Sequence, residues 1–183
     1  MPDKEFAVRT VARGASLREA GQEPRLDQLR FAGQMALWSL RQGLGLLRGD
    51  ITARELMVEA FAVTGVERAL VPLEMFMRVL AAGAHRPLEL RAPRSALLGH
   101  DEALLLRALA ACQAGERALA RGLLENMVTA AAARVGTLAL DDMAAVFTLR
   151  GLRLADTTCG RLSALEPVFA RAAFAGAGLS LLH

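Results

Sequence analysis

The chain has 183 residues, of which 54% are hydrophobic and 22% charged, and its formal net charge at pH 7 is +3. This length is ordinary for one domain, and the apolar share can bury a sizeable core. So small a charge surplus does not indicate nucleic-acid binding, because that function needs a dense basic face. The longest uncharged runs, 31–40 and 172–183, are shorter than the roughly 20 apolar residues that cross a bilayer, so we expect no transmembrane segment.

The composition favours helix over strand. The chain has no tyrosine and a single isoleucine, Ile51, whereas alanine and leucine recur throughout. Alanine, leucine, arginine and glutamate have high helix propensities, while β-branched and aromatic residues favour strands. Arginine predominates over the single lysine, Lys4, which is typical of a GC-rich bacterial genome. We therefore expect an all-α protein of bacterial type.

The first 24 residues lack the sustained hydrophobic period of the remaining chain. They contain Gly14, Gly21 and Pro24 among alternating charges, which is typical of a terminal tail. We expect a flexible N-terminal tail over 1–24 and a single helical domain over 25–183. The start also lacks the positive and then apolar segments of a secretory leader, so we expect a cytoplasmic protein.

The first predicted helix begins near residue 25. Leu29, Leu40 and Leu44 belong to a series of apolar residues at steps of three and four, which places them along one side of a helix. Gly43 and Gly45 each cost about 1 kcal/mol relative to alanine inside a helix. We expect the helix to weaken at these glycines and to end before residue 49.

Two more helices are predicted before residue 85. Asp50 or Thr52 can cap the second, and Thr52 opens a capping-box sequence, so we expect a start at Thr52 and an end at Gly65. The third ends at Gly83. Pro72 either lies in its first turn or kinks it, because proline breaks a hydrogen bond in a helix interior.

The middle of the chain, from 85 to 99, is predicted to be extended. Two prolines bracket it, and Leu88 and Leu90 alternate with the charged residues Glu89 and Arg91. This segment divides the helical region into two halves.

Further helices are predicted after this segment. One is capped by Asp101 and ends at Gly115, and the next runs from 116 to about 134 and ends at Gly136, so the two form a helical hairpin. A sixth helix is expected over about 141–150. A last one starts near residue 163. The expected fold is a compact orthogonal bundle of six or seven helices, built from helical hairpins on either side of the short extended connection.

No residue pattern indicates catalysis or a cofactor. The residues that could bind a metal, Cys112, Cys159, His85, His100 and His183, include no two at ligand spacing. We expect both cysteines to be free thiols that are neither catalytic nor disulfide-bonded. No phosphate-binding glycine loop or nucleophile motif occurs. The sequence therefore favours a protein without enzymatic activity, metal or cofactor. The alternative, a helical ligand-binding protein or an enzyme, would need a pocket assembled from distant helices.

The densest positive cluster consists of His85, Arg86, Arg91 and Arg94. Because prolines stiffen this segment, the side chains could be presented together to an anion or an acidic partner. The simpler interpretation is a solvated connection whose arginines keep an extended segment from aggregating, and the sequence favours it. Binding of nucleic acid here is not favoured, since the segment is short and has no aromatic residues near the arginines.

The end of the chain is the second candidate for an interaction. Residues 172–183 are uncharged and include Phe174, Leu179, Leu181 and Leu182, which could bind a protein partner or a second copy of the chain. Equally, they could fold back into the core, since burial of such side chains stabilises wherever it occurs. We expect a non-enzymatic interaction or regulatory module that acts through an apolar helix surface.

Overall fold

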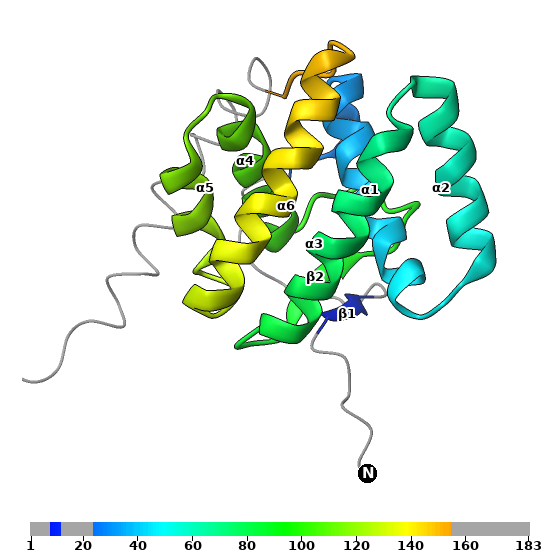
Figure 1. Cartoon of the computed structure of the whole chain (residues 1–183). Helices are drawn as coiled ribbons and strands as arrows, with labels where there is room; N and C mark the ends of the chain where they lie inside the picture. Colours follow the sequence, from blue (N-terminus) through cyan, green and yellow to red (C-terminus); the bar gives the residue numbers. More distant parts are fainter. Residues whose placement is uncertain (1–7, 12–23, 155–183) are drawn as a thin grey trace, which may run out of the picture.

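The computed structural model describes residues 8–11 and 24–154, and this part of the chain is mostly helical. Its six α-helices confirm the all-α bundle expected from composition (Figure 1). The helices are α1 Phe31–Leu47, α2 Ile51–Thr64, α3 Leu70–Gly83, α4 His100–Gln113, α5 Arg117–Leu124 and α6 Ala130–Leu149. The short elements are the strands β1 Val8–Val11 and β2 Leu88–Arg91 and the 3-10 turns η1 Leu26–Gln28 and η2 Glu67–Ala69.

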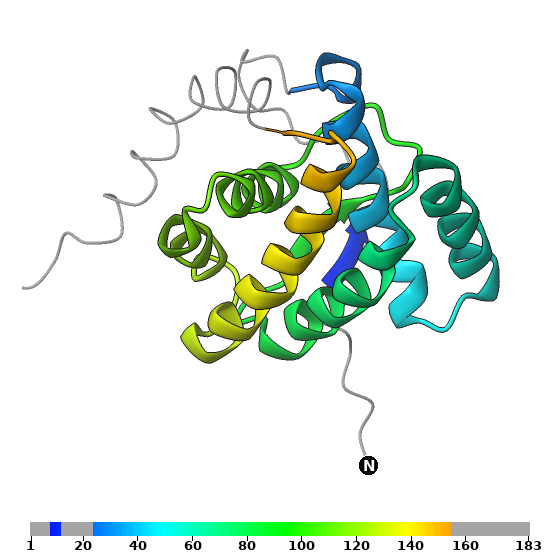
Figure 2. The same cartoon turned by 45° about the horizontal axis from the view of Figure 1, so that its top comes forward.

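Helices α3 and α6 pack side by side and antiparallel in the middle of the bundle. The C-terminal end of α3 at Gly83 meets Ala132 near the start of α6, and Gly65, which precedes α3, lies against Arg150 just after α6. Figures 1 and 2 show α4 and α5 beyond α6 and α2 beyond α3. This arrangement leaves one side of both α3 and α6 at the outside of the molecule.

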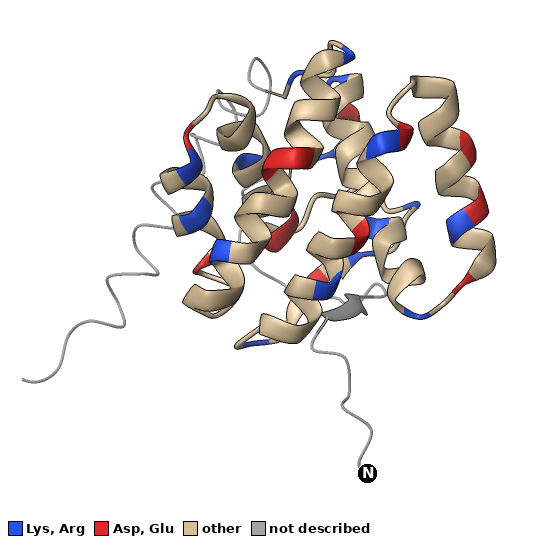
Figure 3. Ribbon diagram, in the orientation of Figure 1, with Lys and Arg blue, Asp and Glu red and all other residues tan. Residues whose placement is uncertain are grey.

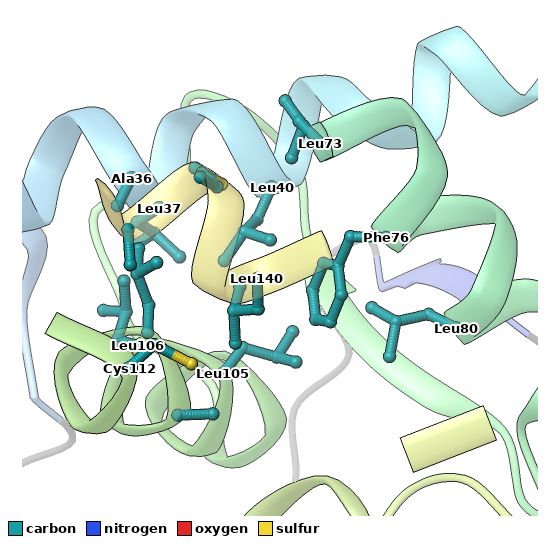
Figure 4. Close-up of a cluster of buried hydrophobic side chains, with 14 of the residues drawn as sticks. Ala36, Leu37, Leu40, Leu73, Phe76, Leu80, Leu105, Leu106, Cys112 and Leu140 are labelled. Carbon is teal, nitrogen blue, oxygen red and sulfur yellow. The ribbon is translucent and has the colours of Figure 1, made fainter. Parts of the chain in front are cut away.

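The core lies behind α3 and α6 and includes side chains from every α-helix. Phe76 of α3 and Leu140 of α6 meet Leu40 of α1 and Leu105 of α4 there, and each of these four is at most 1% exposed (Figure 4). Burial of a Leu or Phe side chain contributes roughly 1.5 to 3 kcal/mol. A single hydrophobic cluster thus holds residues 24–154 together.

Glycines of α1 allow close contact between helices and do not end the helix. A Cβ atom on Gly43 would lie 2.7 Å from Cγ of Met77, and one on Gly45 would lie 2.6 Å from Cβ of Ala53. The expected weakening of the helix at these glycines was therefore wrong. Packing against α3 and α2 compensates for their low helix propensity.

The start and end of α2 follow from its capping residues. Asp50 is the N-cap, and its carboxylate accepts a hydrogen bond of 3.2 Å from the backbone N–H of Ala53. The helix therefore begins at Ile51, one residue before the expected start. Gly65 ends it with a φ of 68°, a left-handed conformation that glycine adopts without a steric penalty. Pro72 lies in the first turn of α3, where its missing N–H is tolerated.

The helix boundaries between 116 and 150 differ from the expected ones. Helix α5 ends at Leu124, and a separate helix, α6, begins at Ala130. Thr129 caps α6 by accepting a hydrogen bond of 3.4 Å from the N–H of Ala132. Helix α6 then runs without interruption through Gly136, where a helix end was expected. Gly136 is buried against Phe76 and Val79 of α3, so its small size serves helix packing.

The extended segment in the middle of the chain is present as expected. In β2, Leu88 and Leu90 are buried and Glu89 is exposed, which confirms the alternation. Strand β1 pairs with β2 in parallel, with Val8 opposite Leu88. The sequence predicted these residues as part of the N-terminal tail, because four residues among alternating charges show no recognisable hydrophobic period.

Two further expectations concern the ends of the chain and the membrane. Over the described residues no helix combines the length and hydropathy that a membrane crossing requires.

The expected C-terminal features lie outside the described residues, so their roles stay predictions. They are the last helix, near residue 163, and the apolar residues Phe174, Leu179, Leu181 and Leu182.

Candidate interaction surface

The predicted basic cluster lies at the junction of β2 and α4, where part of its charge is already balanced. Two guanidinium nitrogens of Arg86 donate to Asp101 at 3.0 and 2.6 Å, and the arginine Nε donates to the carbonyl of Asn126. His85 is exposed, and its Nε2 lies 3.2 Å from the carbonyl oxygen of Glu125. Arg86 therefore serves the fold, and its guanidinium faces a carboxylate.

The two other arginines of the cluster are placed differently. The backbone N–H of Arg91 donates to Glu102 at 2.8 Å, and its side chain is half-buried and has further interactions. Arg94 is exposed in the following turn. The structure thus places the four residues in one segment, where Arg86 and Arg91 already have partners within the fold. Binding of an anion or acidic partner by His85, Arg86, Arg91 and Arg94 stays a prediction.

Asp101 holds the extended segment against α4 by hydrogen bonds and does not cap the helix, as the sequence predicted it would. The cap position of α4 is Gly99, and the Asp101 carboxylate accepts from the backbone N–H of Glu89 at 2.9 Å as well as from Arg86. Burial by itself would raise the pKa of Asp101, but the hydrogen bonds from Arg86 and Glu89 outweigh it and hold the pKa below its ordinary value. Asp101 is therefore a carboxylate at neutral pH.

The neighbouring Glu102 forms a fully buried ion pair with Arg41. Nε and Nη2 of Arg41 donate to the two carboxylate oxygens at 2.8 and 2.9 Å, and the exposed fraction of both side chains is 0%. Arg41 also donates to the carbonyls of Ser95 and Leu97, and Glu102 also accepts from the N–H of Gly99. A network so fully satisfied joins α1, α4 and the extended segment and has no free group for chemistry.

Together, Asp101 and Glu102 take the place of a neighbouring strand along β2. They accept the N–H groups of Glu89 and Arg91, two residues apart, which point to the same edge of a strand. The opposite edge of β2 pairs with β1. The sequence predicted Asp101 at the start of a helix but did not predict this role, although Arg41, the single charged residue of α1, was a signal for a buried partner.

Neither a reactive thiol nor a metal site appears in the described part of the chain. Burial raises the pKa of Cys112 to about 12, and the charge of Asp141 acts in the same direction, so the thiol is protonated at neutral pH. Cys159 lies outside the described residues. Among those described, no group of three His, Cys, Asp or Glu side chains could hold a metal ion.

A small hollow lies where the end of α1 and the start of α2 meet α3. Its volume is about 180 Å³, and Met77 and Ile51 line it beside Glu74 and two arginines. Glu74 is already bound by both of these arginines, Arg54 and Arg78. Small-molecule sites usually start at about 300 Å³ and direct polar groups at the ligand. The remaining acid of the lining, Asp50, already caps α2. This hollow therefore offers less volume, and its charged side chains already have partners within the fold.

An exposed apolar stripe runs along the whole of α6. Six exposed residues follow one another at steps of 4, 3, 4, 3 and 4, which keeps them on one side of the helix. Of the three largest, Val135 is 49%, Leu138 64% and Leu149 83% exposed. The α6 stripe consists of Ala131, Val135, Leu138, Asp142, Ala145 and Leu149.

Helix α3 carries a shorter stripe of the same kind. Val71 and Met75 are exposed, as are Arg78 and Ala82, at steps of 4, 3 and 4. On both helices the exposed stripe lies opposite the buried residues, and the two helices are packed side by side. The two stripes therefore form one outer surface, which we call the α3–α6 face. Helix α6 has three charged residues among its 20, and α2 has three among its 14 (Figure 3).

The exposed apolar residues of α2 do not form a comparable surface. Ile51 and Val58 lie on one side of the helix and Leu56 and Val63 on another, as their spacing requires at 100° per residue. Glutamates 55 and 59, both exposed, lie between the two sides. Scattered apolar residues are ordinary on protein surfaces, whereas a continuous patch of several hundred Å² marks an interaction site. The α3–α6 face is therefore the candidate functional site.

Comparisons of this chain with models of protein families, with curated proteins and with solved structures find no match.

Proposed function

We propose that this chain is a non-enzymatic helical interaction module that binds a protein partner through the α3–α6 face. The observation that carries the proposal is the α6 stripe, which exposes Val135, Leu138 and Leu149 along a 20-residue helix and contains a single charged residue, Asp142. Apolar residues at such spacing are the anchors by which helices bind partner helices or grooves. Transfer of each large side chain from water into an interface contributes roughly 1.5 to 3 kcal/mol when burial is complete.

The charges on and beside the stripes also support an interface with a protein. Arg78, Arg134 and Asp142 are exposed on the two helices, so the apolar residues are accompanied by polar groups of both signs. Interfaces typically combine an apolar centre with a polar rim, and the rim charges confer specificity and not bulk affinity. No large single-sign field is present here, which argues against nucleic acid as the partner.

Other features of the structure support a binding role over catalysis. The buried charges Arg41 and Glu102 are fully hydrogen-bonded to each other and to backbone groups, and the Cys112 thiol is protonated. A catalytic site would need such groups to be free of structural partners or to be activated. By contrast, the exposed apolar side chains of the α3–α6 face are not used in the core.

The apparent mass of the chain in lysate of the cells that produce it tests the proposal. Leu138→Lys places a charge in the centre of the face, and Val63→Lys is the matched control on α2, where the valine is 83% exposed. We expect the wild type and the Val63 variant to elute from a sizing column well above the 19.5 kDa of one chain, and the Leu138 variant to elute later. Co-elution of all three forms as single chains would refute the proposal.

A further inference from the structure

Four exposed residues of α6 lie symmetrically about Leu138, three of them in the α6 stripe and the fourth, Arg134, beside it. Counted from Leu138, Arg134 lies four residues before and Asp142 four residues after. Ala131 lies seven residues before and Ala145 seven residues after. All five residues are exposed, so this part of the surface is available to another molecule.

We propose that the partner on the α3–α6 face is a second copy of this chain, with the two α6 helices antiparallel across a twofold axis at Leu138. This inference rests on the proposed function and names the occupant of the same site. In a twofold contact the same patch is used by both copies, so the patch must be complementary to itself. A patch with charges of one sign would repel its copy, whereas this side of α6 exposes one charge of each sign, Asp142 within the stripe and Arg134 beside it.

An antiparallel pairing about Leu138 brings opposite charges together. Residues whose numbers add to twice 138 lie opposite each other, so each Arg134 faces Asp142 of the other copy, and the dimer gains two such pairs. Within the described part of the chain neither residue has an ion pair of its own. Their side chains are therefore available for a contact between copies.

The same register is sterically favourable. At the axis the two Leu138 side chains meet, and their exposed fraction of 64% leaves most of each side chain to be buried. Ala131 of one copy lies opposite Ala145 of the other on both sides of the axis, and small residues allow two helices to approach closely. The pairing thus combines a Leu138 contact at the axis, close backbone approach and two charge pairs, while Val135 lies opposite Asp141 of the other copy, a carboxylate that Arg117 already binds.

A shift of two residues removes these advantages. With the axis at residue 140, Leu138 of one copy lies opposite Asp142 of the other, and the two Asp142 carboxylates come near each other without a cation opposite them. Like charges brought together at an interface repel each other and weaken it. The positions of Arg134 and Asp142 therefore favour the register centred on Leu138 over the one centred on residue 140.

Charge reversal on the purified full-length chain tests this register. Each single reversal, Arg134→Asp or Asp142→Arg, places like charges opposite each other twice per dimer, and the double variant restores two opposite pairs with exchanged positions. By sedimentation velocity over a concentration series, we expect the wild type to form dimers. Each single reversal should weaken dimerisation at least tenfold, and the double variant should recover to within about threefold of wild type. Two single reversals that weaken dimerisation without recovery in the double variant would overturn the register.

Disulfide trapping tests the axis independently. Leu138→Cys in a chain with Cys159→Ser should form a dimer through a single disulfide under mild oxidation, since the two residues meet at the axis, and circular dichroism checks that the variant is folded. The matched control is Val63→Cys in the same background, which should stay monomeric. Cys112 is buried and does not compete.

The outcomes separate this inference from the proposed function. A purified chain that is monomeric at all concentrations and forms no Leu138→Cys dimer overturns the second copy as occupant, whether the face is covered by another protein or by the chain's own C-terminal residues. If the Leu138→Lys variant still elutes early from lysate in that case, the proposed function fails as well. If it elutes late, the proposed function stands with a different protein as partner.

Discussion

The guanidinium of Arg41 and the carboxylate of Glu102 are held in a two-point ion pair from which water is excluded. The pair joins residues 61 positions apart and has an exposed fraction of 0% on both sides. Removal of one member of such a pair leaves the other charge buried without a partner, which costs about 3 to 5 kcal/mol. The pair therefore makes the packing of α1 on α4 sensitive to a single substitution.

We predict that Arg41→Met lowers the free energy of unfolding by about 3 to 5 kcal/mol, because the Glu102 carboxylate loses its counter-charge in the core. Urea unfolding followed by circular dichroism measures the change. Arg68→Met is the matched control, since Arg68 is exposed, lies outside the α3–α6 face and has no ion pair among the described residues, and its effect should stay within about 0.5 kcal/mol. Equal effects of the two substitutions would contradict the role assigned to the buried pair.

A second prediction concerns the pH dependence of stability through Asp101. Its pKa in the folded chain lies below the ordinary value of 3.8, so the folded state binds this proton less readily than the unfolded state. The Asp101 contribution is therefore fully present above pH 3.8 and is lost as the pH falls through the lower folded-state pKa. Asp101→Asn should lower the urea midpoint at pH 7, and this difference from wild type should shrink as the pH falls below 3.8. A difference that grows with acid would contradict the sign.

Two glycines make a matched pair for testing the contact between α3 and α6. A Cβ on Gly83 would overlap Cβ of Ala132, whereas one on Gly122, inside α5, meets nothing within 4 Å. We predict that Gly83→Ala destabilises by about 1 to 3 kcal/mol through overpacking. Gly122→Ala should stabilise by up to about 1 kcal/mol through helix propensity. The urea unfolding midpoints of both variants test this prediction. Ala132→Gly added to Gly83→Ala should recover part of the lost stability.

The Cys112 thiol should be inert in the native chain. Its pKa of about 12 and its burial leave almost no accessible thiolate at pH 8. In a Cys159→Ser chain, we predict that a thiol-specific chromogenic reagent reacts with Cys112 only on the timescale of unfolding, and at once in denaturant. Rapid labelling of the folded chain would contradict the buried position of Cys112 on α4.

Helix class and the short extended segment were predictable because both depend on local signals. Leucine and alanine at helical steps predicted α1 to α4, and the alternation of Leu88 and Leu90 with charged residues predicted β2. The errors occurred where a glycine serves packing between distant segments. Gly136 resembles a helix end in sequence, but its contacts with Phe76 and Val79 keep it inside α6.

That one misplaced boundary also hid the candidate site. With a helix end at Gly136, Val135 and Leu138 belong to different elements and no continuous stripe can be seen. The surface emerges only when a single helix carries both. The pairing of Arg41 with Glu102 was unpredictable for a related reason, since nothing local to either residue indicates which of many charged residues it meets across 61 positions.

Site-specific photo-crosslinking tests most directly whether the α3–α6 face is covered by a protein. A benzophenone amino acid introduced at Leu138, in the cells that produce the chain, should give one discrete protein adduct on irradiation. The same residue at Val63, which is more exposed but outside the face, should give none. Val135→Lys in the chain that carries the crosslinker at 138 should abolish the adduct. The account is contradicted if the adducts at 138 and 63 are equally diffuse, or if a discrete adduct at 138 survives the Val135 substitution unchanged.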